Sequence, residues 1–276
     1  MLRERVVTAV ILAIGVLAAL FWLPATGWLA LAALVLAVGA WEWAGFARLS
    51  RPARVVYAAV TTAAGAAAAI GLNLWDGGAG TLALLPVYAA AIAFWVVVAP
   101  LWLARRPTHT ASALILGFGW IVLLPTFLAL VHLRNLNPLG LLLFMALVWI
   151  ADIAAYFVGR RFGRRKLAPR VSPGKTWEGL GGAVAATAVY ALAWIAFLGD
   201  SSPTLVHDAP WSAAWMLLLV EMLTLLSVIG DLFESAMKRR AGLKDSGNLL
   251  PGHGGLLDRI DALTAVLPAA ALVSLI

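Results

Sequence analysis

Long apolar runs separated by short polar stretches make up most of the chain. A membrane-spanning helix needs about 20 residues to cross ~30 Å of hydrocarbon, and most of the runs approach or reach that length. They show no alternation of apolar and polar residues, which favours helices over barrel strands. The pattern predicts an all-α, polytopic integral membrane protein with about nine transmembrane helices. The runs fall at residues 6–23, 28–44, 55–74, 82–103, 111–131, 138–157, 180–198, 211–229 and 260–276.

Basic residues gather on one side of this predicted topology. If the chain crosses the membrane with each run, all of the 20 Lys and Arg residues except Arg134 fall on the same side. Cytoplasmic loops of membrane proteins carry an excess of Lys and Arg. We therefore expect a cytoplasmic N-terminus, cytoplasmic basic loops and a multi-pass protein of the inner (cytoplasmic) membrane.

Composition excludes several classes of protein. Charged residues make up 12% of the chain and hydrophobic ones 63%, which excludes a soluble globule and a disordered chain. The net charge of +7 is explained by topology and by contact with anionic headgroups, and no aromatic-interleaved basic platform suggests nucleic-acid binding. The absence of cysteine excludes disulfide and thiol chemistry.

One polar stretch, SAMKRRAGLKDSGNLLPGHGGLLDRID at 235–261, contrasts with the rest of the chain. Its lysines and arginines can hold phosphate oxygens, and its carboxylates are ligands that Mg²⁺ prefers. Its glycines permit tight turns and close approach of a ligand. Asp258 and Asp261 are three residues apart, so on a helix they share a face. Just upstream, Asp231, Glu234, Ser235 and Lys238 also repeat at helical spacing. The combination predicts a metal-assisted phosphate site.

This stretch resembles the signature of phosphatidate cytidylyltransferases, also called CDP-diacylglycerol synthases, without a mismatch. The matching positions are Ser235-x-x-Lys238-Arg239, then Lys244-Asp245, then Pro251-x-His253-Gly254-Gly255-x-x-Asp258-Arg259-x-Asp261.

The resemblance implies transfer of the cytidylyl group of CTP to phosphatidate, giving CDP-diacylglycerol and pyrophosphate for phospholipid biosynthesis. It implies that Asp231, Asp258 and Asp261 hold Mg²⁺, as two divalent ions or as Mg²⁺ with a monovalent ion, and that Lys244 and Asp245 join them in catalysis. Expected partners are CTP, phosphatidate and membrane lipids, with a homodimer left open. Expected substrate-binding residues are Ser172, Lys175, Thr176, Ser235, Lys238, Arg239, His253, Gly254, Gly255 and Arg259.

A second motif, SPGKTWEG, covers residues 172–179. Its Gly-Lys-Thr is not a P-loop, because Pro169 stands where that motif requires glycine. The residues alone predict a helix start with Ser172 as its cap, and such an N-terminus with Lys175 nearby is an anion site. The segment also resembles the Ser-Pro-x-Lys-Thr-x-Glu-Gly motif of the same family. Gly174 stands where lysine is expected there, which removes one phosphate-facing cation.

Four acidic residues interrupt or end apolar runs, where a charge is costly and marks a functional candidate. Glu42 lies close to the basic 48–54 loop, which favours a structural ion pair or an interface position. For Asp152, a site and an ion pair are equally supported. Glu221 has no visible partner, and Asp231 directly precedes the signature.

The sequence is interpreted as one membrane domain over 1–276. Residues 1–135 form about five N-terminal helices, and residues 136–276 form the catalytic helices with cytoplasmic loops at 158–179 and 230–259. Two alternatives remain: a membrane transferase acting on an isoprenoid lipid, and an ion or solute transporter lined by intramembrane acids. The dense polar chemistry in loops at one face argues against the transporter. A purely structural scaffold would tolerate Asp261→Asn.

Overall fold

The apolar runs form helices in the computed structural model, which describes residues 2–74, 79–105, 107, 110–198, 213–249 and 254–275. One helical rod is continuous from the 3₁₀ turn η2 (Ala79–Leu84) through α4 (Leu85–Ala93) and the π-turn η3 (Phe94–Val98) to α5 (Ala99–Arg105). The other helices are α1 (Leu2–Trp22), α2 (Ala25–Phe46), α3 (Arg51–Gly71), α6 (Ser112–Leu136), α7 (Pro138–Phe162), α8 (Trp177–Leu198), α9 (Ala213–Ala241) and α10 (Leu257–Val273).

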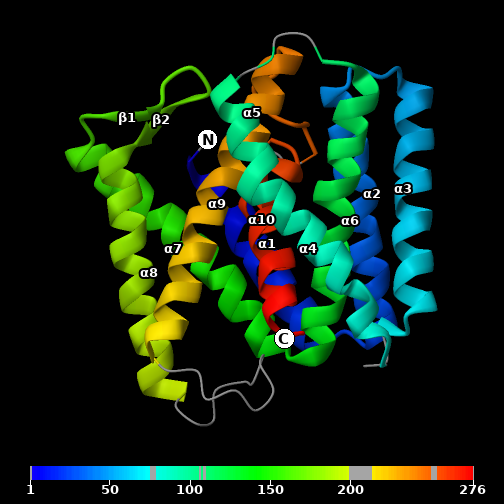
Figure 1. Ribbon diagram of the computed structural model, residues 1–276, viewed down its shortest axis with the longest axis horizontal. Coiled ribbons are helices and arrows are strands. Elements are labelled where there is room, and N and C mark those ends of the chain that lie inside the picture. The colour runs from blue at the N-terminus through cyan, green and yellow to red at the C-terminus, as the bar shows by residue number, and fades with distance from the viewer. Residues whose placement is uncertain are drawn as a thin grey trace.

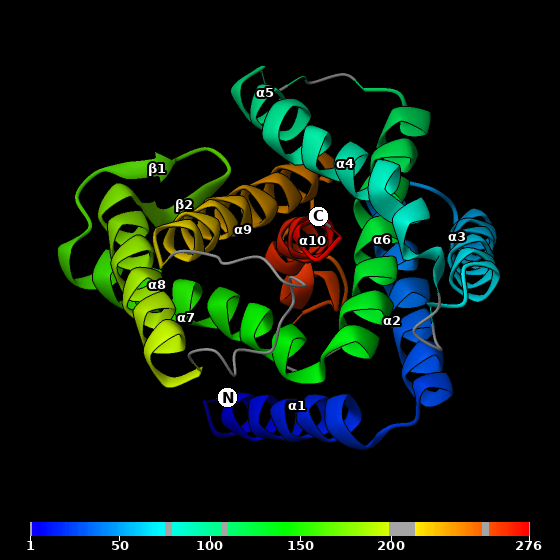
Figure 2. The same ribbon diagram turned by 60° about the horizontal axis from the view of Figure 1, so that its bottom comes forward.

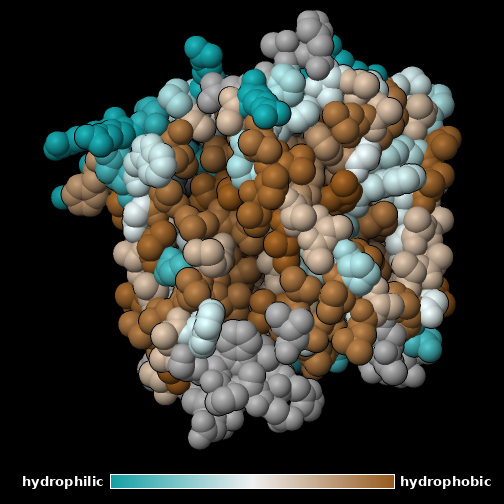
Figure 3. Space-filling view, viewed as in Figure 1, coloured by the Kyte–Doolittle hydropathy of each residue, from teal (hydrophilic) through white to brown (hydrophobic). Residues whose placement is uncertain are grey.

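Seven of the helices within the described residues are long and apolar enough to cross a membrane. This confirms the expected all-α, multi-pass membrane architecture, while the count of nine crossings and the orientation of the N-terminus stay predictions. The polar connections α2–α3 and α7–α8 and the C-terminal ends of α5 and α9 lie at the same end of the bundle, the top of Figure 1. Hydrophilic side chains gather at that end in Figure 3, and apolar ones cover the waist of the visible face.

Helix α10 occupies the middle of the bundle, with α9, α7 and α6 around it (Figure 2). Every residue from Ala262 to Ala271 is buried, as expected of a helix that is apolar all round. Pro268 has no N–H to bond the carbonyl of Thr264 four residues earlier. That carbonyl instead accepts hydrogen bonds from Trp95 Nε1 at 3.1 Å and from Thr126 Oγ1 at 3.2 Å. Neighbouring helices thus satisfy the polar group that the proline frees.

Aromatic side chains fix α9 beside η3 and α6. Phe233 is fully buried and meets Trp95 edge-on at 5.6 Å and Phe94 edge-on at 5.2 Å between ring centroids. The same ring meets Phe118 of α6 at 6.0 Å. Aromatic pairs in these geometries each contribute about 0.5–1.5 kcal/mol beyond burial. The packing fixes the rotation of α9, and so the direction in which its polar residues point.

The polar end of the bundle is more ordered than the sequence analysis expected. Helix α7 continues to Phe162 and α9 to Ala241, so residues 158–162 and 230–241 are helical and not loops. Polar residues can continue a helix once it has left the hydrocarbon layer, so the apolar runs predicted helices that are too short.

A small antiparallel hairpin follows α7. Strand β1 (Lys166–Ala168) pairs with β2 (Ser172–Thr176) in the register Lys166 to Thr176 and Ala168 to Ser172. The expected helix start at Ser172 is therefore wrong. Helix α8 begins at Trp177, and Thr176 Oγ1 accepts a hydrogen bond from Gly179 N at 3.1 Å. The cap is thus Thr176, because the backbone of 172–176 is engaged in strand pairing.

Candidate active site

One face of α9 carries the polar residues of the candidate site. Asp231, Ser235 and Lys238 lie three or four residues apart, so they follow one side of the helix. Ser235 Oγ donates to Asp231 Oδ1 at 3.2 Å. Lys175 Nζ, from strand β2, lies 2.6 Å from Asp231 Oδ2. The hairpin thereby joins the second motif to the first, and the structure brings Lys175, Asp231, Ser235 and Lys238 together.

Lys238 connects α9 to the start of α10. Its ammonium donates to Glu234 Oε2 at 2.9 Å and to Asp258 Oδ1 at 2.5 Å. The lysine is 8% exposed and Glu234 is 3% exposed, so both charges of that pair are buried. Buried charges require such pairing, and removing one partner leaves the other uncompensated. Lys238 therefore holds the two carboxylates in position.

Asp258 is hydrogen-bonded through both oxygens. Its Oδ2 accepts from Ser246 N at 2.9 Å, from Ser246 Oγ at 3.0 Å and from Gly255 N at 2.8 Å. Burial opposes the ionisation of Asp258, but Lys238 and these backbone donors outweigh it and hold its pKa below the usual carboxylate value. Asp258 is thus an ionised anchor between α9, α10 and the loop that follows α9.

Asp261 lies one turn further along α10, partly buried beside Asp231, Glu234 and Lys238. The close approach of the two helices depends on Gly230, because a Cβ there would lie 2.8 Å from the Asp261 carbonyl oxygen. Asp152 of α7 is also near, within the electrostatic range of Asp231 and Lys175. Sequence reasoning left Asp152 undecided and did not select Glu234 as a site residue. The signal that could have selected Glu234 was its helical spacing, three residues after Asp231 and four before Lys238.

Glu42 of α2 caps the N-terminus of α10. Its carboxylate accepts from Leu256 N at 2.9 Å and from Leu257 N at 2.8 Å. Ser246 Oγ lies 2.8 Å from Glu42 Oε2 and 3.0 Å from Asp258 Oδ2, and its single proton is shared between the two carboxylates. The first amides of a helix lack partners within it, and an acidic group there also matches the helix dipole. The structure therefore gives Glu42 a capping role in place of the expected ion pair, since these partners among the described residues are backbone amides and a hydroxyl. The expected interface position stays a prediction. Glu42 is 4% exposed.

Glycines leave room for these carboxylates. A Cβ on Gly255 would lie 2.6 Å from Glu42 Oε2, and one on Gly247 would lie 2.5 Å from Glu42 Oε1. Gly254 has φ of +85°, a left-handed conformation that side chains rarely adopt. The glycine-rich stretch therefore shapes the backbone around Glu42 and Asp258.

The remaining expected site residues are exposed, lie on another face of α9 or in β2, or fall outside the described residues. Lys244, Asp245 and Arg259 are exposed, and within the described residues no hydrogen bond from Lys244 or Asp245 reaches the cluster. Arg239 lies on another face of α9, and Ser172 lies in β2 without a side-chain hydrogen bond to a described residue. His253 lies outside the described residues.

The donor set suits a hard cation, although the expected trio of ligands is not preformed. Among the described residues, no group of three acidic or histidine side chains has the spacing of a metal site. The carboxylates of the cluster nevertheless outnumber the two lysines paired with them, and no donor among the described residues bonds the buried Glu234 Oε1, whose side chain faces Asp261. Excess buried carboxylate oxygen is the environment that Mg²⁺ prefers.

Comparison with known proteins agrees with the resemblance of the signature. The model of the cytidylyltransferase family matches residues 3–276. A phosphatidate cytidylyltransferase of Pseudomonas aeruginosa is 40% identical, over 98% of this chain and 96% of its own length. That of Haemophilus influenzae is 40% identical over 97% and 96%. That of Bacillus subtilis is 42% identical over 50% and 49%.

The matched region includes both motifs and every residue of the cluster described above. The polar residues that meet at one end of α9 and α10 thus lie in a chain whose relatives share its whole length. The chain belongs to the cytidylyltransferase family of enzymes.

Proposed function

We propose that this protein transfers the cytidylyl group of CTP to phosphatidate, forming CDP-diacylglycerol and pyrophosphate for phospholipid biosynthesis. The observation that carries the proposal is the convergence of two distant motifs. Lys175 of the hairpin reaches Asp231 beside the Lys238–Asp258 pair. Relatives that match nearly the whole chain are named for this activity.

The reaction depends more on neutralising phosphate charge than on a general base. An oxygen of the lipid phosphate attacks the α-phosphorus of CTP in line, one P–O bond forms, and the bond to pyrophosphate breaks. The attacking oxygen is already anionic, so no strong general base is required. The barrier lies in bringing two polyanions together, and positioned cations lower it.

The two lysines are suited to different tasks. The Lys175 side chain is 24% exposed and has one carboxylate partner among the described residues, so its ammonium is available to a phosphate. The Lys238 side chain is 10% exposed and lies between two carboxylates, which suits it to hold Glu234 and Asp258 in place. We assign phosphate binding to Lys175 and positioning to Lys238.

Magnesium completes the proposed site. Asp231, Asp258 and Asp261 would hold it, and Glu234 Oε1, which no donor among the described residues bonds, offers a further ligand oxygen. When bound, Mg²⁺ supplies neutralisation of the phosphate charge and Lewis-acid polarisation. Whether the site takes two divalent ions, or Mg²⁺ with a monovalent ion, is decided by metal titration.

The membrane fold suits a lipid substrate. The cluster lies at the end of the bundle where the basic connections gather, which we place at the cytoplasmic face of the inner membrane. The headgroup of phosphatidate would meet CTP there while its acyl chains stay in the bilayer.

The test is synthesis of CDP-lipid by the purified protein from radiolabelled CTP, phosphatidate and Mg²⁺. Asp261→Asn and EDTA should each reduce product at least about 100-fold, because charge stabilisation of that size is typical of such groups. Adding Mg²⁺ after EDTA should restore it. Glu221→Gln serves as the control, since it removes a carboxylate of α9 about 15 Å along the axis from Asp231.

Each result has a distinct meaning. Product that survives Asp261→Asn but not EDTA would remove Asp261 from the metal site. A folded protein that makes no product from phosphatidate but labels an isoprenoid phosphate would replace the lipid substrate. Loss of activity on Glu221→Gln equal to that on Asp261→Asn would contradict the placement of the site.

A further inference from the structure

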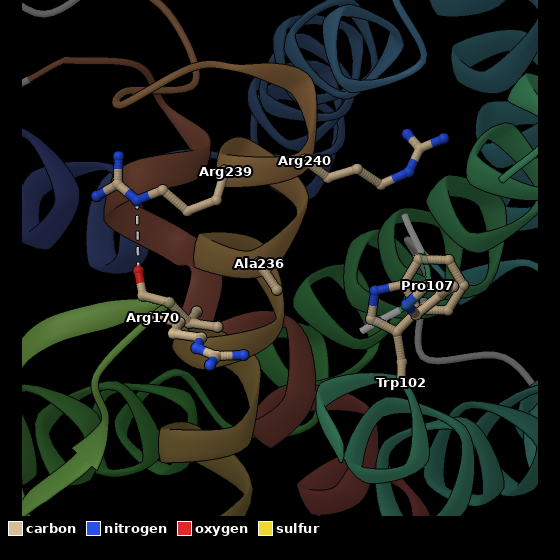
Figure 4. A pocket seen from close by; sticks show the side chains of 7 residues that line it. Trp102, Pro107, Arg170, Ala236, Arg239 and Arg240 are labelled. Atoms are coloured by element: carbon tan, nitrogen blue, oxygen red, sulfur yellow. Dashed lines mark hydrogen bonds between the residues drawn. The ribbon is translucent and has the colours of Figure 1, made fainter. Parts of the chain in front are cut away.

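A second basic site lies on another face of α9. A pocket of about 350 Å³ is lined by Arg170, Arg239 and Arg240, together with Trp102, Val171 and Ala236 (Figure 4). Its residues come from α5, the hairpin turn and the last turns of α9.

This pocket is separate from the carboxylate cluster. Successive residues of an α-helix are about 100° apart, so Arg239 and Arg240 lie about 100° and 200° around α9 from Lys238. The hairpin lies over both faces: Lys175 on β2 reaches Asp231, while Arg170 and Val171 in the turn before β2 line the pocket.

The positive charge of the pocket is not neutralised by its described surroundings. No acidic side chain lines it. Arg239 donates to the carbonyls of Val171 at 3.4 Å and Leu243 at 3.3 Å, and Arg240 donates to that of Thr110 at 2.5 Å. Carbonyl partners leave the guanidinium charges in place.

Further donors and charge reinforce this field. Arg240 Nε is buried and has no hydrogen-bond partner in the part of the chain that the structure describes. Arg48 donates to the backbone carbonyl of Arg240 at 3.2 Å, which adds a fourth guanidinium nearby. A guanidinium has five N–H donors, and a phosphate offers acceptors in a matching fork.

The floor of the pocket is apolar, whereas a binding site for a soluble anion is expected to be polar throughout. Val171 belongs to a small hydrophobic cluster with Ala168 and Leu232, against which Leu103 and Ala236 pack. Trp102 forms one wall, and indole rings favour the level of lipid headgroups. The pocket also lies at the polar end of the bundle, above the apolar waist.

We propose that this pocket binds the phosphate of an anionic phospholipid, at a site distinct from the carboxylate cluster. Arg170 and Arg239, on the hairpin side of the pocket in Figure 4, hold the headgroup phosphate, and Arg240 on the other side adds positive charge. The apolar surface between α5 and α9 receives the upper acyl chain. This inference does not depend on the proposed reaction, since the pocket shares no side chain with the carboxylate cluster.

Lipid binding tests it on the full-length protein in mixed micelles, with retained lipid counted by native mass spectrometry. The probes are phosphatidylglycerol, whose phosphate is a diester, and phosphatidylcholine, whose headgroup is zwitterionic. We expect at least about a tenfold preference for phosphatidylglycerol, and its loss in the double variant R170Q/R239Q. One charge-assisted hydrogen bond is worth about that factor.

The control is R164Q, which removes an exposed arginine before β1 that does not line the pocket. Arg170 and Arg239 are exposed, so their loss should leave the melting temperature unchanged. The melting temperature of each variant is measured in parallel. Equal preference in wild type and R170Q/R239Q would overturn the proposal. So would displacement of phosphatidylglycerol by CTP or inorganic phosphate at stoichiometric concentration, which would assign the pocket to a soluble phosphate.

Discussion

Replacement of Glu42 by alanine is expected to destabilise the protein strongly, although Glu42 lies more than 200 residues before the signature aspartates. The carboxylate accepts hydrogen bonds from the amides of Leu256 and Leu257 and from Ser246 Oγ. Without it, the two amides at the start of α10 are left buried and without an acceptor. The hydroxyl of Ser246 retains Asp258 Oδ2 at 3.0 Å.

The size of the effect follows from these contacts. A hydrogen bond to a charged group contributes about 1.5–3 kcal/mol, so the two amide bonds together amount to about 3–6 kcal/mol before relaxation. A change of 1 kcal/mol shifts the melting temperature of a chain of about this size by roughly 2–4 °C. We therefore expect Glu42→Ala to lower the melting temperature by about 6–24 °C.

Glu42→Gln should have an intermediate effect, because the amide keeps one acceptor but turns an NH₂ group toward a backbone N–H. Thermal unfolding in detergent, followed by the change in tryptophan fluorescence, measures both variants. The matched control is Glu221→Gln, because Glu221 accepts one long hydrogen bond from Thr187 at 3.4 Å. A Glu42→Ala protein that melts within about 2 °C of wild type would refute the capping role. So would a Glu221→Gln variant as unstable as Glu42→Gln.

Three further substitutions test the site. Lys238→Met leaves Glu234 and Asp258 without their shared cation, so it should lower the free energy of unfolding by about 3–5 kcal/mol and abolish activity. Chemical denaturation measures the change, and a variant as stable as wild type would contradict the buried pairing. Lys175→Gln breaks one partly exposed ion pair, so we expect an unchanged melting temperature but at least about a tenfold higher KM for CTP in steady-state assays; an unchanged KM would remove it from phosphate binding. Gly230→Ala places a methyl group against the Asp261 carbonyl, so it should lower the free energy of unfolding by about 1–3 kcal/mol and reduce kcat. Wild-type stability and kcat in this variant would show that the two helices need not approach so closely.

The sequence determined most of the secondary structure and pointed to the polar stretch that carries the candidate site. Apolar runs of membrane-spanning length have few alternative structures, because backbone groups in lipid must bond within the segment. The spacing of Asp231, Ser235 and Lys238 predicted one polar helix face, and α9 has that face. The signature also placed Asp258 and Asp261 on a shared helix, which begins at Leu257.

The tertiary structure decided what each polar residue contacts. Glu42 caps α10 across more than 200 residues, and Lys175 reaches Asp231 because strand pairing, unrecognised in the sequence, carries it there. Adjacent Lys238 and Arg239 looked equivalent in the signature, yet the rotation of α9 directs one to the carboxylates and the other to the arginine pocket. A local pattern fixes helices because their hydrogen bonds are local. Partners of a buried charge depend on which helices pack together, and only the packed bundle decides that.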